Sequence, residues 1–222
     1  MDFLGILAQP TTLHPIRLTL KALAVSGGLH LVLGVLIAYY LTSGRGPLRS
    51  VVDFLVTLPL VFPPIATGFV LLMLLGRTGW LGRISPVDII FNFPGVVIAS
   101  FVSGLPLMVK PVEAALKGDV KKLAEISQVL GKTDWQTFWL VLLPNIRRNV
   151  LAGWFLAIGR SLGEVGVTLM LGGNIIGKTN TLSLEIYNAV FSGEFDRAMV
   201  LAVVIGCFSL AVFAALKKLA AV

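Results

Sequence analysis

Arg160 and Glu164 are the residues of this sequence whose types and spacing most clearly allow chemistry inside an apolar segment. They lie four positions apart, so on a helix they share one face and can form an ion pair. A charge at the centre of a membrane costs about 2.5–3.5 kcal/mol even on insertion scales. The pair must therefore face a bundle interior, a partner subunit or water. Two interpretations stay open: a gate on a pathway through the membrane, or a buried clamp between helices.

A second candidate for chemistry is the segment 172–179, Gly-Gly-Asn-Ile-Ile-Gly-Lys-Thr. It satisfies the pattern G-x4-G-K-[ST], whose backbone amides cradle nucleotide phosphates between a strand and a helix. Here the pattern follows a long apolar segment, and too little polar chain remains for an α/β domain. We therefore interpret residues 172–181 as a turn that leads into a short helix within 182–195.

The sequence offers no other catalytic or metal-binding set. Cys207 is the single cysteine, which excludes an intrachain disulfide. His14 and His30 cannot build a metal site with it, and we expect His30 to be a packed, hydrogen-bonded residue. We therefore expect a chain without catalytic residues, metal or cofactor of its own.

The composition is that of a membrane protein. Of the 222 residues, 56% are hydrophobic and 13% charged, whereas soluble domains carry about 25% charged residues. Apolar runs of this length can cross the hydrocarbon core as helices, which satisfy their own backbone hydrogen bonds. We predict an all-α membrane protein, a single domain over residues 1–222, with five transmembrane helices. The predicted spans are about 22–41, 51–75, 94–112, 150–171 and 198–216.

The N-terminal residues do not predict a further span. Asp2 stands where a signal peptide has basic residues. Pro10 and Pro15 interrupt the early apolar residues. We therefore expect residues 1–17 to be too short and too interrupted to cross the membrane.

The basic residues predict the orientation. Cytoplasmic loops carry an excess of lysine and arginine. With five spans, three basic segments share one side, so we predict an external N-terminus and a cytoplasmic C-terminus. This distribution also explains the net charge of +7 without nucleic-acid binding. The basic residues of these segments are Arg45, Arg49, Lys117, Lys121, Lys122, Lys132, Arg147, Arg148, Lys217 and Lys218.

The cytoplasmic loop of residues 117–148 is polar and amphipathic. Asp119 can cap a helix that follows it, and Gly131 suits the end of that helix. Thr133 and Gln136 form a capping-box pattern for a second helix. Such a pair forms a compact knob for a soluble partner, and helices lying on the membrane surface are the open alternative. The apolar residues of the pair are Val120, Leu123, Ile126, Leu130, Trp135, Phe138, Trp139 and Leu142.

Three prolines interrupt the second apolar run. Pro59, Pro63 and Pro64 each remove a backbone donor and free a carbonyl group. The segment could line a pathway, act as a hinge, or be a static kink that neighbouring helices absorb.

The loop resembles the cytoplasmic "EAA" loop of permease subunits of binding-protein-dependent ABC importers, Glu-Ala-Ala-x3-Gly-x9-Ile-x-Leu-Pro. In this sequence Ile126 and Ser127 replace the two alanines, and Val141 replaces the isoleucine. The resemblance implies the fold of a type I importer permease, in which this loop is the coupling helix that docks into a cytoplasmic ATPase. The residues assigned to ATPase coupling are Glu125, Ile126, Ser127, Leu130, Gly131, Val141, Leu143 and Pro144.

The resemblance covers about residues 16–216 and is most similar to molybdate permeases, with sulfate and tungstate permeases as close relatives. It is carried by the proline-rich segment 58–68, by Gly-Arg-Thr-Gly-Trp-Leu-Gly at 76–82, and by Gly-Arg-Ser-Leu-Gly-Glu-Val-Gly at 159–166. Asn174 and Thr181 also fit that family's pattern. Pro59, Pro63, Pro64, Arg160 and Glu164 are the candidates for a pathway or gate.

The resemblance also implies the partners. We expect a homodimer with the passage at its interface, two ABC ATPase subunits that bind ATP and magnesium, and an external or periplasmic oxyanion-binding protein. The complex would import an oxyanion, first of all molybdate, by alternating access across the cytoplasmic (inner) membrane. A tungstate or sulfate permease is the nearest alternative, and a stand-alone ion-coupled carrier or channel is the alternative of another class.

Overall fold

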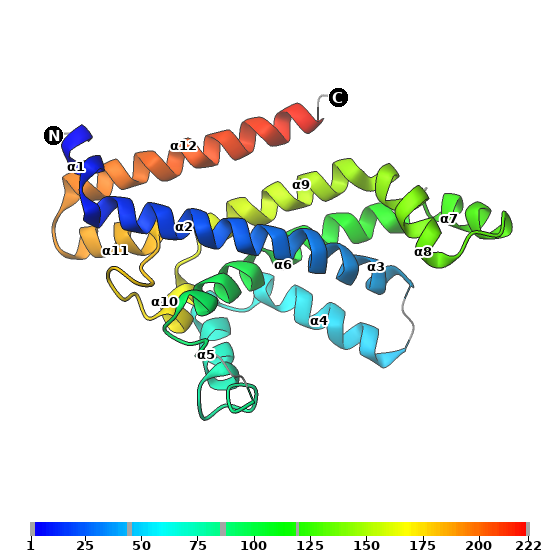
Figure 1. Cartoon of the computed structure of the whole chain (residues 1–222), viewed down its shortest axis with the longest axis horizontal. Helices are drawn as coiled ribbons and strands as arrows, with labels where there is room; N and C mark the ends of the chain where they lie inside the picture. Colours follow the sequence, from blue (N-terminus) through cyan, green and yellow to red (C-terminus); the bar gives the residue numbers. More distant parts are fainter. Residues whose placement is uncertain (1–2, 44–45, 85–87, 119, 221–222) are drawn as a thin grey trace.

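The computed structural model describes residues 3–43, 46–84, 88–118 and 120–220, and every regular element in these ranges is a helix (Figure 1). Most of the long helices run along one long axis, with successive segments in alternating directions. We call the end that holds α7 and α8 the loop end, and the opposite end, with α1 and α11, the far end. The elements are α1 (Phe3–Ala8), α2 (Pro10–Leu29), η1 (His30–Gly34), α3 (Val35–Ser43), α4 (Pro47–Val61), α5 (Pro64–Leu75), α6 (Phe93–Lys117), α7 (Val120–Val129), α8 (Asp134–Thr137), η2 (Phe138–Leu142), α9 (Leu143–Leu162), α10 (Gly166–Gly172), α11 (Leu182–Phe191) and α12 (Phe195–Ala220).

The first long helix runs continuously over Pro10–Ser43 through α2, η1 and α3. The expected interruption is found at Pro10, because α1 ends at Ala8 and α2 begins at Pro10, whereas the expectation that Pro15 interrupts the region is wrong. Pro10 stands in the first turn of α2, where a missing N–H leaves nothing unpaired. Pro15 removes the helical bond to the carbonyl of Thr11, and the Nη2 group of Arg197 donates to that oxygen instead at 2.9 Å. A contact from α12 therefore makes the proline tolerable.

Of the five predicted spans, those at 22–41, 94–112 and 198–216 each lie within one continuous helix, whereas the other two are interrupted. The second is divided into α4 and α5, and the fourth is bent by 66° between α9 and α10. Three helices in the described ranges are long and apolar enough to cross a membrane, or four if the bent pair is one span. The count of five therefore stays a prediction, as does the orientation.

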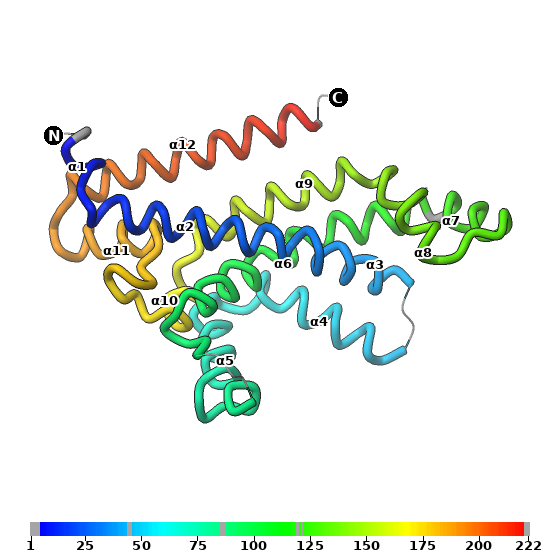
Figure 2. Tube along the Cα trace, viewed as in Figure 1, coloured from blue at the N-terminus to red at the C-terminus, as the bar shows by residue number. Residues whose placement is uncertain are grey.

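Two groups of buried apolar side chains hold the bundle together. The loop-side cluster joins α3, α4, α6, η2 and α9, and the far-side cluster joins α6 to α10 with α5 packed against both. Only α6 contributes buried members to both clusters. Figure 2 shows α5 turning away from the long axis that the other long helices follow. The buried members are Val35, Ala38, Leu41, Val56, Met108, Val109, Val112, Leu116, Phe138, Leu142, Ile146, Val150 and Ala157 on the loop side, and Ala99, Val167 and Leu171 on the far side.

Candidate functional site

The loop region forms two short helices joined by a tight turn, which we call the knob (residues 120–142). Helix α7 closes with a Schellman motif: Lys132 N–H donates to the Ser127 carbonyl at 3.1 Å, and Gly131 N–H donates to that of Gln128 at 2.9 Å. Gly131 has φ +80°, a conformation that glycine adopts without a Cβ penalty. The predicted helix end at Gly131 is therefore confirmed. Asp119, the predicted cap, lies outside the described residues.

Helix α8 begins with the predicted capping box. Thr133 Oγ1 accepts from Gln136 N–H at 3.2 Å, and Gln136 Oε1 accepts from Thr133 N–H at 3.1 Å. A contact that the sequence did not reveal joins α8 to α7. The hydroxyls of Ser127 and Thr137 lie 3.0 Å apart, and both residues are buried. Ser127 stands where the EAA pattern has alanine, so this departure cross-links the two helices of the knob.

The knob is fixed to the bundle through its second half. Phe138 and Leu142 belong to the loop-side cluster, and the ring of Phe138 lies 4.8 Å from that of Tyr39. Leu143 N–H bonds the carbonyl of Phe138, five residues back, which makes η2 a π-turn. Pro144 cannot bond the carbonyl of Leu140, and this missing bond suits the wider turn. The Leu-Pro of the pattern thus marks the joint between the knob and α9.

The rest of the knob presents apolar side chains that the described part of the chain leaves largely exposed. Ile126, Leu130 and Trp135 are 56%, 75% and 65% exposed. Val129 is 88% exposed and Trp139 is 47% exposed. Exposed apolar patches of this kind, on a segment that the bundle holds rigidly, are typical of protein interaction sites.

Glu125 lies at the edge of this surface. It lines a hollow of about 440 Å³ between the knob and the loop ends of α3 and α4. Arg49 and Asp134 also line the hollow, together with Tyr39, Thr42 and Gln128. The acidic residue of the EAA pattern, Glu125, is therefore placed in a mixed-charge recess beside the apolar surface. Of the other predicted coupling residues, Val141 and Leu143 are half-buried and Pro144 is exposed.

Arg160 and Glu164 form the predicted ion pair, with Nη1 and Oε2 2.7 Å apart. The expectation that they share a face of one helix is wrong, because α9 ends at Leu162 and Glu164 lies in the break before α10. The side chain of Glu164 is only 2% exposed, whereas that of Arg160 is 33% exposed. The second oxygen of the carboxylate, Oε1, accepts the N–H of Val167 at 2.7 Å. The structure therefore joins the predicted pair to the start of α10.

The prolines of the second apolar run do not act alike. Pro59 lies inside α4, whereas Pro63 and Pro64 divide α4 from α5. Because Pro63 and Pro64 have no N–H group, the carbonyls of Pro59 and Leu60 lose their helical hydrogen-bond partners. Val61, Phe62, Pro63 and Ile65 are exposed around this division, and we call this surface the break face.

A group of four charges near the loop end was missed as a cluster. Lys110 of α6 forms ion pairs with Asp53 of α4 and, at 3.4 Å, with Glu113, which also pairs with Lys117 at 2.6 Å. Among the residues of α4, all of which the structure describes, Val56 alone is buried. The Lys110–Asp53 ion pair therefore adds to the packing of Val56 in joining α4 to α6. The sequence did contain a signal for this cluster, because Asp53 lies inside one apolar run and Lys110 lies at the end of another.

The segment with the nucleotide-binding pattern is a closed turn. Thr179 Oγ1 donates to the Gly172 carbonyl at 2.6 Å and accepts from Ile175 N–H at 3.0 Å. Thr179 is fully buried, so its hydroxyl is committed to the turn. The segment lies between α10 and α11, and the described ranges contain no strand. This geometry agrees with its interpretation as a turn.

Comparison with known proteins identifies the class. The family model described as "Binding-protein-dependent transport system inner membrane component" matches residues 30–218. This chain belongs to that family, and it is a multi-pass membrane protein of the permease type.

Particular relatives narrow the resemblance. The chain is 35% identical to the molybdenum transport system permease protein ModB of Azotobacter vinelandii, over 92% of each protein. It is 35% identical to the chloroplastic sulfate permease 2 of Chlamydomonas reinhardtii, over 95% of this chain and 58% of that longer protein. It is 32% identical to the sulfate transport system permease protein CysW of Synechococcus elongatus, over 94% of this chain and 74% of that one. These relatives confirm the resemblance to molybdate permeases, and sulfate permeases match equally well.

Solved structures share the fold. A crystal structure of a bacterial alginate ABC transporter, in complex with an alginate-bound periplasmic protein, matches 98% of this chain and 80% of its own with a TM-score of 0.74. A second structure of an alginate importer matches 99% of this chain with a TM-score of 0.73. The identities are 18% and 20%.

Proposed function

We propose that this chain is the permease subunit of an ATP-driven importer that moves an oxyanion across the cytoplasmic membrane, with molybdate as the first candidate. Family membership over residues 30–218, together with a rigid knob that exposes apolar side chains, carries the proposal. Sulfate is the second candidate, because sulfate permeases are as similar as molybdate permeases. The chain itself supplies no catalytic group, and the ATPase is a separate subunit that binds ATP and magnesium.

The knob is the proposed contact with that ATPase. Its surface of Ile126, Leu130 and Trp135 fits an apolar cleft, and Glu125 offers a carboxylate to a cation at the rim. The Schellman turn connects the two helices of the knob, and η2 continues directly into α9. A force on the knob is therefore passed to α9 and, through Phe138, to the loop-side cluster.

The passage is proposed to lie between two copies of the chain, at the break face. Lipid cannot bond the free carbonyls of Pro59 and Leu60, so backbone of this kind is tolerated only against protein or water. Val61, which is 82% exposed, directly follows Leu60 in the chain. Asp53, eight residues before Val61 on the same helix, has a side chain 48% exposed, which favours a wet or protein-covered surface over lipid for α4.

The mechanism is alternating access. ATP draws the two ATPases together, the knobs follow, and the passage opens outward to receive the anion from an external binding protein. Hydrolysis then returns it to the inward-open state. The N-terminus would be external and the C-terminus cytoplasmic, with α11 and the turn at 172–181 on the side where the binding protein docks.

The substrate is tested in vesicles that contain this chain with its ATPase, supplied with the binding protein and either molybdate or sulfate. The anion that stimulates ATP hydrolysis and accumulates in the vesicles is the substrate. If the chain alone carries solute at full rate, the proposal fails in favour of a stand-alone carrier.

The coupling role is tested at Gly131. A Cβ there meets no atom within 4 Å, so Gly131→Val acts through backbone strain at φ +80° and not through a clash. We expect uptake and ATPase stimulation to fall at least about fivefold, given the 1–2 kcal/mol that a left-handed conformation costs an L-residue. The matched control is Gly131→Asn, because asparagine tolerates this conformation. Equal uptake by both variants and wild type would remove the knob from the coupling mechanism.

A further inference from the structure

The carboxylate of Glu164 connects two helices that point in different directions. One oxygen pairs with Arg160, which belongs to α9, and the other accepts the N–H of Val167, which belongs to α10. The helices on the two sides differ in direction by 66°. Both carboxylate oxygens are used, and the side chain is buried. The group therefore lies where it can hold the angle between α9 and α10.

The two helices belong to different parts of the core. Ile146, Val150 and Ala157 of α9 are members of the loop-side cluster, to which the knob is fixed. Val167 and Leu171 of α10 are members of the far-side cluster. A change in angle at Glu164 would therefore move the far-side cluster relative to the knob.

Helix α10 in turn packs closely against α5. A Cβ at Gly166 would lie 2.9 Å from Pro64 Cβ, and one at Gly68 would lie 2.8 Å from Met170 Cβ. Such close approach means that α5 and α10 pack closely at these glycines, with no room there for a larger side chain. The division at Pro63 and the bend at Glu164 therefore lie side by side, and both half-helices beyond them form one pair.

We propose that Glu164 is a positioning residue that sets the angle between α9 and α10, and so transmits movement of the knob to the α5–α10 pair. Arg160 holds the carboxylate in place from α9 and does not bind the transported anion. This inference rests on the proposed function, since it supplies the link between the knob and the break face. Of the two interpretations of the Arg160–Glu164 pair, it favours a clamp between helices, because the ion pair acts by fixing the angle between α9 and α10.

The test uses the reconstituted complex and measures anion uptake per ATP hydrolysed. Glu164→Ala should lower this ratio by about tenfold or more, the effect of losing one charge-assisted hydrogen bond. The double variant Arg160→Glu/Glu164→Arg restores opposite charges but offers no acceptor to Val167 N–H, so it should remain as impaired as Glu164→Ala. Gly163→Ala is the matched control and should behave as wild type, because a Cβ there meets nothing within 4 Å.

A distance measurement covers the case in which Glu164→Ala does not fold. Spin labels are placed at Leu156 and Ile176, which are exposed on either side of the bend, in a Cys207→Ser background. Glu164→Gln, which keeps an oxygen for Val167 N–H but loses the charge, should broaden the distance distribution. The Gly163→Ala control should leave it unchanged.

Three results would overturn the inference. Recovery of uptake in the charge-exchanged double variant would show that ion pairing alone matters. A rise in the anion's KM at unchanged kcat in Arg160→Gln would show that Arg160 binds the anion. An unaltered distance distribution in Glu164→Gln would show that the bend does not depend on the carboxylate. By contrast, a wild-type complex that does not use ATP to move an oxyanion would refute the proposed function itself.

Discussion

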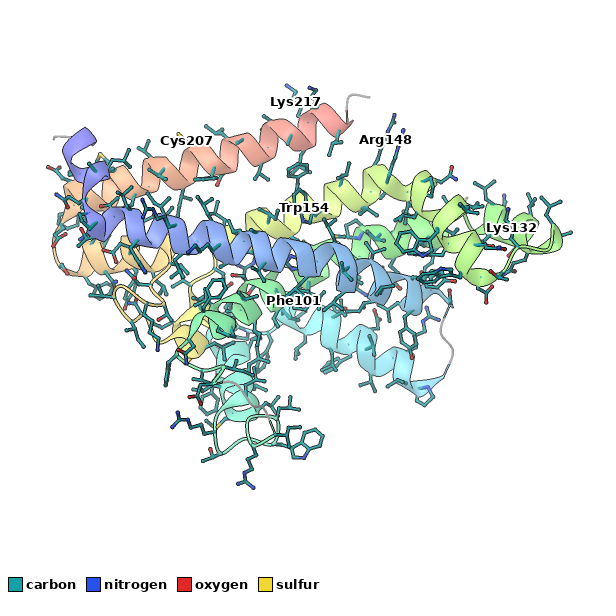
Figure 3. All side chains as sticks on the ribbon, in the orientation of Figure 1. Phe101, Lys132, Arg148, Trp154, Cys207 and Lys217 are labelled. Carbon is teal, nitrogen blue, oxygen red and sulfur yellow. The ribbon has the colours of Figure 1, made fainter. Side chains whose placement is uncertain are left out.

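Helix α12 and the α4–α5 segment both expose large apolar side chains, but they do so in different ways. α12 is unbroken over Phe195–Ala220, and only 11% of its most apolar window is buried. It runs along one edge of the bundle, with Cys207 on its exposed surface (Figure 3). α4 and α5 are divided at Pro63, carry Asp53, and expose Val61 beside unpaired backbone carbonyls.

Exposed apolar side chains therefore mark two different kinds of surface in this chain. An unbroken apolar helix has satisfied its backbone internally and can face lipid. A divided helix with a half-exposed carboxylate cannot, so its exposed side chains mark a surface that protein or water covers. Apolarity alone does not distinguish the two faces, whereas backbone hydrogen bonding does.

The largest expected effect comes from placing the same charge on both faces. Leu210→Arg puts a guanidinium on the exposed face of α12, where lipid makes it cost about 2.5–3.5 kcal/mol. We expect the amount of inserted chain to fall sharply. Val61→Arg on the break face should leave that amount near the wild-type level while transport falls. The measurement is the quantity of tagged chain in the membrane fraction, with the ATPase co-expressed.

Equal loss in both arginine variants would mean that the break face also contacts lipid, and the proposed passage would have to lie elsewhere. Equal tolerance would mean that α12 is covered by a partner. A Leu210→Ala variant serves as the control, because it shortens the side chain without adding charge.

A smaller effect is expected from matched glycine substitutions. Gly68→Leu forces a side chain against Met170 Cβ at 2.8 Å and Val167 Cα at 3.0 Å, and overpacking of this kind costs about 1–3 kcal/mol. Gly206→Leu on α12 meets no atom within 4 Å. Thermal unfolding of the detergent-purified complex should therefore begin at a lower temperature for Gly68→Leu, by about 2–4 °C per kcal/mol, and should be unchanged or later for Gly206→Leu.

The contrary order would show that α12 is closely packed in the assembled transporter, or that α5 is free to move away from α10. Gly68→Ala refines the measurement, because a single Cβ probes the contact without filling the space beyond it.

The sequence was sufficient where local chemistry decides the structure. Hydropathy located the helices α6 and α12, and the residues Gly131, Thr133 and Gln136 determined the end of α7 and the start of α8 because a turn needs those side chains at those positions. It was insufficient where a distant partner decides. Pro15 is accepted because of Arg197, 182 positions further on, and no local pattern reports that bond.

The candidate site divides in the same way. The spacing of Arg160 and Glu164 predicted their ion pair correctly, but the assumption of one continuous helix hid the bond from Glu164 to Val167. The Ser127–Thr137 contact was hidden because it joins two helices whose relative orientation no periodicity gives. The role of each residue in transport stays a prediction.

The smallest expected effect concerns the C-terminal end of α5. Arg77, just beyond α5, donates Nε and Nη2 to the two oxygens of Asp88 at 3.1 and 2.8 Å. These hydrogen bonds hold the pKa of Asp88 below its usual value of 3.8. A lowered carboxyl pKa contributes stability that is present above the ordinary value and is lost as pH falls through the folded one. Both side chains are largely exposed, so the contribution is small.

Arg77→Ala should therefore lower the unfolding temperature slightly at pH 7, and the difference from wild type should vanish once the pH falls below the depressed pKa of Asp88. The measurement is thermal unfolding of both proteins in detergent at pH 7, pH 4 and pH 3, with Arg83→Ala as the control for loss of a positive charge. A large effect at pH 7 would mean that α5 is held by its tip. A small effect of Arg77→Ala together with a clear effect of Gly68→Leu would mean that α5 is attached through its contact with α10. This is where α5 must be held if the bend at Glu164 is to move it.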